Sequence, residues 1–156
     1  MIIRRAGAAD LPIWARMLAA LHEDASVADW TAELETLTQL SEPYIGFLAF
    51  TDEGEPIGMI DARVRNYAEG APELHAPYVE DLWVDPSHRR SGVGRRLLEA
   101  VEAWAVEQGF DWLGSDARLD NDESHQWHRS IGFEETERLV VFGKPLAPME
   151  RTSTSG

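Results

Sequence analysis

One short loop decides the fold, and it reads Arg89-Arg90-Ser91-Gly92-Val93-Gly94. Before it, residues 78–84 are rich in aromatic and branched side chains and are stopped by Asp85-Pro86, which is typical of a central strand. After it, apolar residues recur at helical spacing until Gly109, where the helix should end. They are Val93, Leu97, Val101 and Trp104. The sequence therefore predicts a strand, a loop and a long amphipathic helix in direct succession.

The loop has the properties of a diphosphate site. The first N–H groups of a helix are unpaired and point outward, and the macrodipole favours an anion there. Gly92 and Gly94 have no side chain to block a close approach. A Rossmann fingerprint would need a third glycine where Leu97 stands, and a P-loop lysine is missing. Four arginines surround the loop: Arg89, Arg90, Arg95 and Arg96. The alternative is a basic helix start that only offsets surface charge.

The composition limits the kind of protein that this chain can be. A length of 156 residues with 44% hydrophobic side chains can bury one core, so we expect a single domain. The chain has no cysteine, which excludes disulfides, thiolate zinc sites and a cysteine nucleophile. It has neither a signal-peptide pattern nor an apolar run long enough to span a membrane. We therefore expect a cytoplasmic protein that does not bind membranes.

The charge of the chain bears on its partners. It has 14 basic and 28 acidic residues and a formal net charge of −14, which repels phosphate backbones and attracts cations. This argues against nucleic acid as a partner and favours a small polycationic substrate. The alternative is that the acidity only aids solubility.

The rest of the chain alternates between strand and helix patterns. We expect strands at 2–4, 45–50, 56–65 and 110–115, and a final strand pair within 134–146. Helices should follow Asp10-Leu11-Pro12 and the capping motif at 26–29, and a further helix should cover 122–131. The interpretation is one domain over residues 1–146 with a peripheral tail at 147–156.

Two linked motifs resemble the GNAT superfamily of N-acetyltransferases. The signature [RQ]-x-x-G-x-[GA] is met at residues 89–94. The pattern N-x-x-A-x-x-x-Y-x-x-x-G-F fits residues 121–133 at Asn121 and at Gly132-Phe133, while Ser124 replaces the alanine and His128 the tyrosine. The resemblance implies an α/β (α+β) fold with a mixed central sheet of about six or seven strands and about four helices. The sheet would be splayed between strands 4 and 5, with acetyl-CoA in the opening.

The same resemblance assigns residues to the cofactor. The backbone of Leu82 and Val84 would pair with the pantetheine arm, and Asn121 would hold acetyl-CoA from the other side. The full implied set is Leu82, Val84, Arg89, Arg90, Ser91, Gly92, Val93, Gly94, Arg95, Asn121, Ser124 and His128. The superfamily often forms dimers through its C-terminal strands, which leaves a homodimer open.

Roughly residues 63 to 146 resemble one branch of the aminoglycoside 6′-N-acetyltransferases, through the stretches 79–90, 114–117 and 124–138. The branch commonly has tryptophan at the position of His22 and usually glycine at that of Asp81. The resemblance implies acetyl transfer to the 6′-amine of an aminoglycoside by direct attack in a ternary complex. The alternatives are acetylation of a polyamine, an amino sugar or a protein N-terminus, or a non-catalytic acyl-CoA-binding module.

Two carboxylates are candidates for the base that deprotonates the acceptor amine. Strand alternation would place Glu80 on the same face as Leu82 and Val84. Asp116, at the end of the neighbouring strand, is the preferred candidate. The alternative for Glu80 is an ion pair with an arginine across the sheet, and that for Asp116 is a turn or N-cap carboxylate. By the family resemblance, a backbone N–H in the splayed strand would stabilise the oxyanion.

The remaining candidates are aromatic or contain imidazole. His128, at the tyrosine position, could return a proton to the departing thiolate, or it could only hydrogen-bond within the fold. His125 and His128 lack a third metal ligand, so we expect no metal. Tyr67 and Trp127 could line the acceptor pocket, although core packing is an equal alternative for Trp127.

Overall fold

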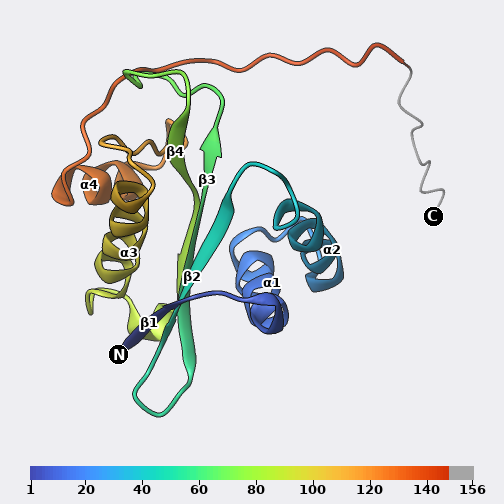
Figure 1. Cartoon of the computed structure of the whole chain (residues 1–156), viewed down its shortest axis with the longest axis vertical. Coiled ribbons are helices and arrows are strands. Elements are labelled where there is room, and N and C mark those ends of the chain that lie inside the picture. The colour runs from blue at the N-terminus through green and yellow to red at the C-terminus, as the bar shows by residue number, and fades with distance from the viewer. Residues whose placement is uncertain (148–156) are drawn as a thin grey trace.

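The computed structural model describes residues 1–147 and places an antiparallel sheet between two layers of helices (Figure 1). The strands lie in the order β1-β2-β3-β4. They are β1 (Ile2–Arg5), β2 (Tyr44–Phe50), β3 (Pro56–Arg65) and β4 (Ala76–Val84). The helices are α1 (Leu11–Leu21), α2 (Val27–Leu37), α3 (Val93–Glu107) and α4 (Asp122–Ser130). Short 3₁₀ turns lie at Ala8–Asp10 and Pro86–His88.

Local sequence signals account for where the helices begin. α2 has the capping box predicted from the sequence, because Ser26 Oγ accepts from Asp29 N at 3.1 Å and Asp29 accepts from Ser26 N at 2.9 Å. α1 carries a proline in its first turn, where no backbone donor is needed. α3 follows Gly92, whose φ of 85° is left-handed and suits glycine. These helix predictions are confirmed, as is the helix near 122–131.

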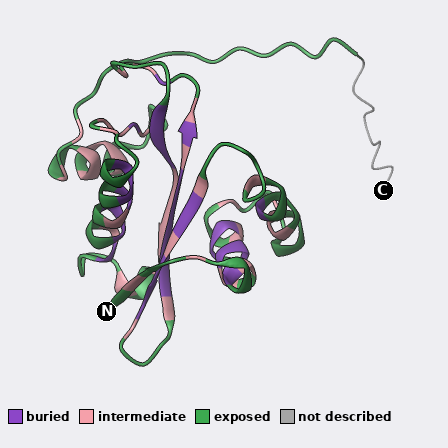
Figure 2. Cartoon of the chain, viewed as in Figure 1, coloured by how far each residue is buried: buried purple, intermediate pink, exposed green. Residues whose placement is uncertain are grey.

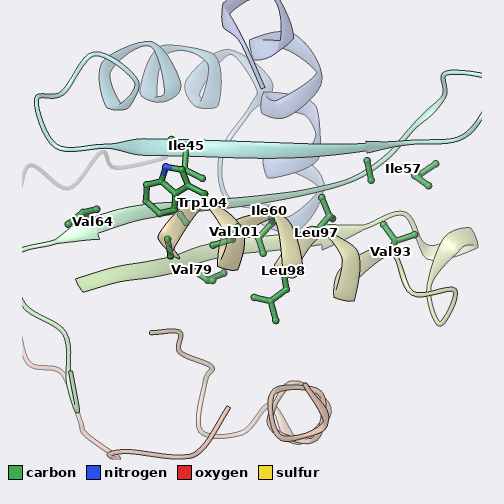
Figure 3. Packing of buried hydrophobic residues seen from close by; sticks show 13 residues of the cluster. Ile45, Ile57, Ile60, Val64, Val79, Val93, Leu97, Leu98, Val101 and Trp104 are labelled. Atoms are coloured by element: carbon green, nitrogen blue, oxygen red, sulfur yellow. The ribbon is translucent and has the colours of Figure 1, made fainter. Parts of the chain in front are cut away.

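Each face of the sheet has its own hydrophobic core. α3 covers one face, where residues such as Leu97, Val101 and Ile60 are fully buried (Figure 3). α1 and α2 cover the other face over a second cluster that includes Trp14, Leu34 and Met59. Figure 2 shows burial concentrated in the strands and in the inward sides of the helices. The sheet is therefore buried on both faces, which explains its long apolar runs.

The prediction of about six or seven strands is wrong for residues 1–147, where the sheet has four strands. The predicted strand at 110–115 makes a single parallel bridge, between Tyr78 and Gly114. The predicted strand pair at 134–146 forms no ladder, since within residues 1–147 no strand lies beside it to exchange hydrogen bonds. This segment leaves the body of the molecule after Thr136, whose hydroxyl donates to the carbonyl of Glu69. Farther along the segment, Phe142 is 90% exposed.

The sequence also predicts a peripheral C-terminal tail and no membrane-spanning segment. The predicted tail lies outside the described residues except for position 147. No helix within residues 1–147 combines the length and the apolar character that crossing a bilayer requires.

Candidate functional site

The loop from 89 to 94 lies at the start of α3, where the sequence predicts an anion cradle. Arg90 has a left-handed φ of 62°, and Gly92 is left-handed as well, so the chain turns sharply before the helix. The first helical bond runs from Arg96 N to Gly92 O at 3.1 Å, which leaves the N–H groups of Val93, Gly94 and Arg95 pointing out of the helix end. A Cβ at Gly92 would meet no atom within 4 Å, so the loop is open at this residue.

Arginines line the rim of this cradle. Arg89, Arg90 and Arg95 are exposed, and Arg89 Nε donates to the carbonyl of Val84 at 3.0 Å. The Ser91 hydroxyl donates to the carbonyl of His88, which closes the turn. Exposed guanidinium groups around free N–H donors are suited to a diphosphate.

α4 brings the second predicted motif to the same side of the sheet. Asn121 caps α4, because its Oδ1 accepts from Ser124 N at 3.1 Å. The Trp127 ring lies 3.5 Å from where a Cβ of Gly94 would stand, beside Leu82. Trp127 therefore lies against the start of α3, while Tyr67, 62% exposed, lies in the β3–β4 loop. The structure does not bring these two aromatic residues together.

His128 has hydrogen bonds at both ring nitrogens. Nδ1 lies 2.7 Å from the carbonyl oxygen of Ser124, which can only accept, so Nδ1 carries the proton. Nε2, 2.9 Å from Ser115 Oγ, then accepts the hydroxyl proton in the neutral ring. The ring also makes edge contacts with Trp127 and Phe133. His128 is thus held in one tautomer, with Nε2 directed at a hydroxyl group.

A β-bulge changes the face of the sheet on which the carboxylates of β4 lie. Asp61 of β3 pairs with Asp81, but the next residue, Ala62, pairs with Val79, so Glu80 is an extra residue in β4. Leu82 and Val84 pack into the core beneath α3, whereas Asp81 bonds a residue at the end of α1. The expectation that Glu80 shares a face with Leu82 and Val84 is therefore wrong, because alternation does not continue through a bulge.

Glu80 is held by an arginine from the neighbouring strand. Arg65 Nε and one of its terminal nitrogens each donate to a Glu80 oxygen at 2.8 Å, a bidentate pair. The pair raises the pKa of Arg65. The cross-sheet ion pair considered for Glu80 is confirmed, and both of its oxygens are occupied.

The same arginine links Glu80 to Asp116. Its guanidinium lies 3.7 Å above the Tyr78 ring, and the Tyr78 hydroxyl donates to Asp116 Oδ2 at 3.0 Å. Burial and the Asp116 charge raise the pKa of Tyr78, so the phenol remains a donor. Asp116 is exposed and keeps its second oxygen free of any hydrogen bond within residues 1–147. Of the two predicted bases, Asp116 is the more accessible.

A buried acid that the sequence patterns did not indicate, Asp61, lies on the neighbouring strand β3. Asp61 is 0% exposed, and its Oδ2 accepts from Trp14 Nε1 at 3.1 Å and from the Tyr44 hydroxyl at 2.8 Å. Burial, followed by the charge of Asp81, raises its pKa well above the usual value. Asp81 in turn lies 2.6 Å from His22 Nε2. His22 and Asp81, the two departures from the resembling branch, are thus in direct contact. In the sequence, the signal for the contact of Asp61 with Trp14 and Tyr44 is that Asp61 is a single acid within a mostly apolar strand.

The described residues contain no group of three or more His, Cys, Asp or Glu side chains that could hold a metal ion.

Comparison with known proteins agrees with this geometry. The model of the acetyltransferase (GNAT) family matches residues 14–133. The aminoglycoside N(6′)-acetyltransferase type 1 of Stenotrophomonas maltophilia is 40% identical over 149 residues, 94% of each chain. That of Acinetobacter haemolyticus is 38% identical over 148 residues, covering 94% of this chain and 99% of the relative.

Solved structures with similar folds include two aminoglycoside 6′-N-acetyltransferases. AAC(6′)-Ig from Acinetobacter haemolyticus, in its apo form, has a TM-score of 0.85 at 35% identity and covers 94% of this chain and 100% of that chain. AAC(6′)-Iy, in complex with the bisubstrate analogue CoA-S-monomethyl-acetylneamine, has a TM-score of 0.85 at 30% identity, with 92% and 97% coverage.

Asp61→Asn should flatten part of the pH dependence of stability. Because the pKa of Asp61 is raised by folding, the wild type loses stability as the pH rises from the unfolded value, about 4, through the folded value. An amide does not titrate, so the free energy of unfolding of the variant should gain on the wild type from pH 5 to pH 8. Urea unfolding at both pH values measures this, with exposed Asp24→Asn as control. A difference that stays constant with pH would contradict the assignment.

Proposed function

We propose that this chain, which belongs to the acetyltransferase (GNAT) family, transfers the acetyl group of acetyl-CoA to the 6′-amine of an aminoglycoside. The observation that carries the proposal is the arrangement around β4. An anion-binding helix start lies on one side of this strand, and carboxylates gather on the other. The anionic diphosphate of CoA needs the positive helix start, and a polycationic acceptor needs the carboxylates. The acetyl thioester must lie between these two ligands.

The cofactor side fits acetyl-CoA. The free N–H groups at Val93–Arg95 and the arginines of the loop would hold the diphosphate. Between Glu80 and Val84 the outer edge of β4 has no strand partner in residues 1–147, so the backbone of Leu82 and Val84 could pair with the amides of the pantetheine arm. Asn121, Ser124 and His128 would flank it from α4. The family resemblance predicts acetyl-CoA in a splay between strands 4 and 5; residues 1–147 form no fifth strand, and we propose that the free edge of β4 takes the place of that splay.

The chemistry follows from direct attack in a ternary complex. The neutral amine nitrogen forms a bond to the acetyl carbon, the carbon–sulfur bond breaks, and CoA leaves as a thiolate. The acetylated nitrogen loses one proton to become an amide, and the thiolate gains one, so the proton count is unchanged. Asp116 accepts the proton that the acceptor ammonium must lose, since it has a free oxygen and is exposed. Glu80, neutralised by Arg65, positions Tyr78 and thereby Asp116. His128 would supply the proton for the thiolate in its imidazolium form, in which Nε2 also carries a proton: Nε2 then donates to Ser115 Oγ, and the Ser115 hydroxyl passes its own proton to the sulfur.

We also propose a homodimer. Four consecutive apolar residues are exposed in the C-terminal segment, from Leu139 at 53% to Phe142 at 90%. The segment extends away from the body of the molecule (Figure 1), and a second copy could supply the strand that it lacks. Residues 1–146 would then form one domain whose sheet is completed on dimerisation. The net charge of −14 argues against a nucleic-acid partner, and we propose the cytoplasm, where acetyl-CoA is available, as the location.

Turnover is tested by CoA release with a panel of amines that includes aminoglycosides, a polyamine and an amino sugar. Asp116→Asn should lower kcat on an aminoglycoside by about 10²- to 10⁴-fold, since a positioned general base contributes about that factor. Glu80→Gln should lower it less, because Glu80 acts through Arg65. The control is exposed Asp111→Asn. Release of CoA with other amines and with no aminoglycoside would overturn the acceptor, and no release with any amine would overturn the enzyme.

Gly92→Ala should weaken the binding of acetyl-CoA by about tenfold or more in calorimetry. A Cβ at a left-handed φ costs about 1–2 kcal/mol, and relief of this strain would turn the N–H donors away from the diphosphate. Gly54→Ala is the matched control, since Gly54 is left-handed at φ 90° with nothing within 4 Å of its Cβ, but lies in the β2–β3 turn. Equal affinity losses in both variants would show that strain alone is responsible.

Val141→Asp should convert the dimer to a monomer in analytical ultracentrifugation, because a charge would be buried in the new sheet contact. Val106→Asp, on an exposed position of α3 at 69%, should leave the mass unchanged. A wild type that remains monomeric at all concentrations would refute the homodimer.

A further inference from the structure

The bulge in β4 turns Glu80 and Asp81 toward the α1 and α2 side of the sheet, together with Asp61 of β3. Asp61 and Asp81 are directly opposite each other, and directly opposite residues in antiparallel strands share a face. Burial raises the pKa of Tyr44, which packs on this face, and the charges of Asp61, Asp81 and Glu80 raise it further. Three acids therefore lie close together where a cationic acceptor would approach β4.

These acids differ in how far the protein itself satisfies them. Glu80 gives both oxygens to Arg65. Asp81 has one contact, from Oδ1 to His22 Nε2 at 2.6 Å, and its Oδ2 has no hydrogen-bond partner within residues 1–147. The Asp81 side chain is 17% exposed, so this oxygen lies in a partly desolvated position. A carboxylate oxygen in such a position is left for a donor from outside the chain.

A second, independent observation points the same way. Asp61 is completely buried next to Asp81, and its Oδ1 has no hydrogen-bond partner among the described residues. Native proteins rarely leave a buried oxygen unsatisfied, and two adjacent acids repel each other at low dielectric. Within residues 1–147 no lysine or arginine forms an ion pair with either of them. A cation that binds at Asp81 would offset the repulsion between the two acids.

His22 holds Asp81 in place from the other side. It lies just after α1, and its ring stacks on Trp30 at a centroid distance of 5.2 Å. The stack fixes the ring plane, so Nε2 is aimed at Asp81 Oδ1. An aromatic wall beside a partly buried carboxylate favours an ammonium group carried on a ring over a small hydrated ion.

We propose that His22 and Asp81 form an acceptor-positioning pair, in which Asp81 binds an ammonium group of the acceptor other than the one that is acetylated, and His22 orients Asp81. The inference rests on the proposed function and adds a specificity determinant to it. Acceptors with a second amino group at the correct distance should be preferred over those with a hydroxyl group there.

The test is steady-state kinetics of Asp81→Asn with a set of aminoglycosides, in which single amino groups are replaced by hydroxyl groups. For the best acceptor the variant should raise KM about tenfold, while kcat changes less than about twofold and the KM for acetyl-CoA stays the same, since one charge-assisted contact is lost. For one hydroxyl-substituted acceptor the wild type and the variant should have equal KM values. Asp81→Asn relieves repulsion with Asp61, so its thermal midpoint should not fall.

His22 is tested through rescue by a conservative variant. His22→Gln keeps an N–H that can reach Asp81 and should stay close to the wild-type KM, whereas His22→Ala should raise KM about threefold. Glu23→Gln, an exposed neighbour, removes one negative charge without a contact to the pair and controls for the overall charge.

The outcomes separate the two hypotheses. If the wild type turns over no aminoglycoside, the proposed function fails, and this inference fails with it. If the wild type turns over aminoglycosides and Asp81→Asn leaves KM unchanged for all of them, the inference alone fails. A fall in kcat at constant KM would also overturn the inference, because loss of a contact to a remote ammonium group should raise KM and leave kcat nearly unchanged.

Discussion

One extra residue in β4 sets the chemistry of the site. Without the bulge, alternation would send Glu80 and Asp81 to opposite faces of the sheet, and one acid would enter the apolar core beneath α3. With it, both acids reach the α1 side, while Leu82 and Val84 still anchor the strand in the other core. In the proposed function, the bulge lets one strand face an anionic cofactor on one side and a cationic acceptor on the other.

The acids around the bulge show how environment divides roles among chemically similar side chains. Asp61 is buried beside another acid, so its protonated form is favoured, and it accepts bonds from Trp14 and Tyr44. Glu80 is neutralised by Arg65. Asp116 is exposed and bonded to a phenol whose pKa is raised. Burial beside Asp81 raises the pKa of Asp61, whereas Glu80 and Asp116 differ in the partners that hold them and in their exposure.

The parts that the sequence predicts are those whose signals are local. The loop at 89–94, the capping box at 26–29 and the spacing along α3 each depend on residues a few positions apart. Two features that depend on distant residues were not predicted: the bulge depends on register with β3, and His22 meets Asp81 across 59 positions. The strands expected within 134–146 have the right composition, but a strand also needs a neighbour, and composition does not supply one.

The exposed run from Leu139 to Phe142 also has a consequence for the handling of the protein. Short, uncharged, β-branched and aromatic segments can stack without limit into aggregates. This run is bounded by Arg138 on one side and by Gly143-Lys144 on the other. Flanking cations of this kind act as gatekeepers, since repeated stacking would bring like charges together, while a single pairing leaves them in solvent. The segment can therefore pair with one other strand while it resists growth into a fibril.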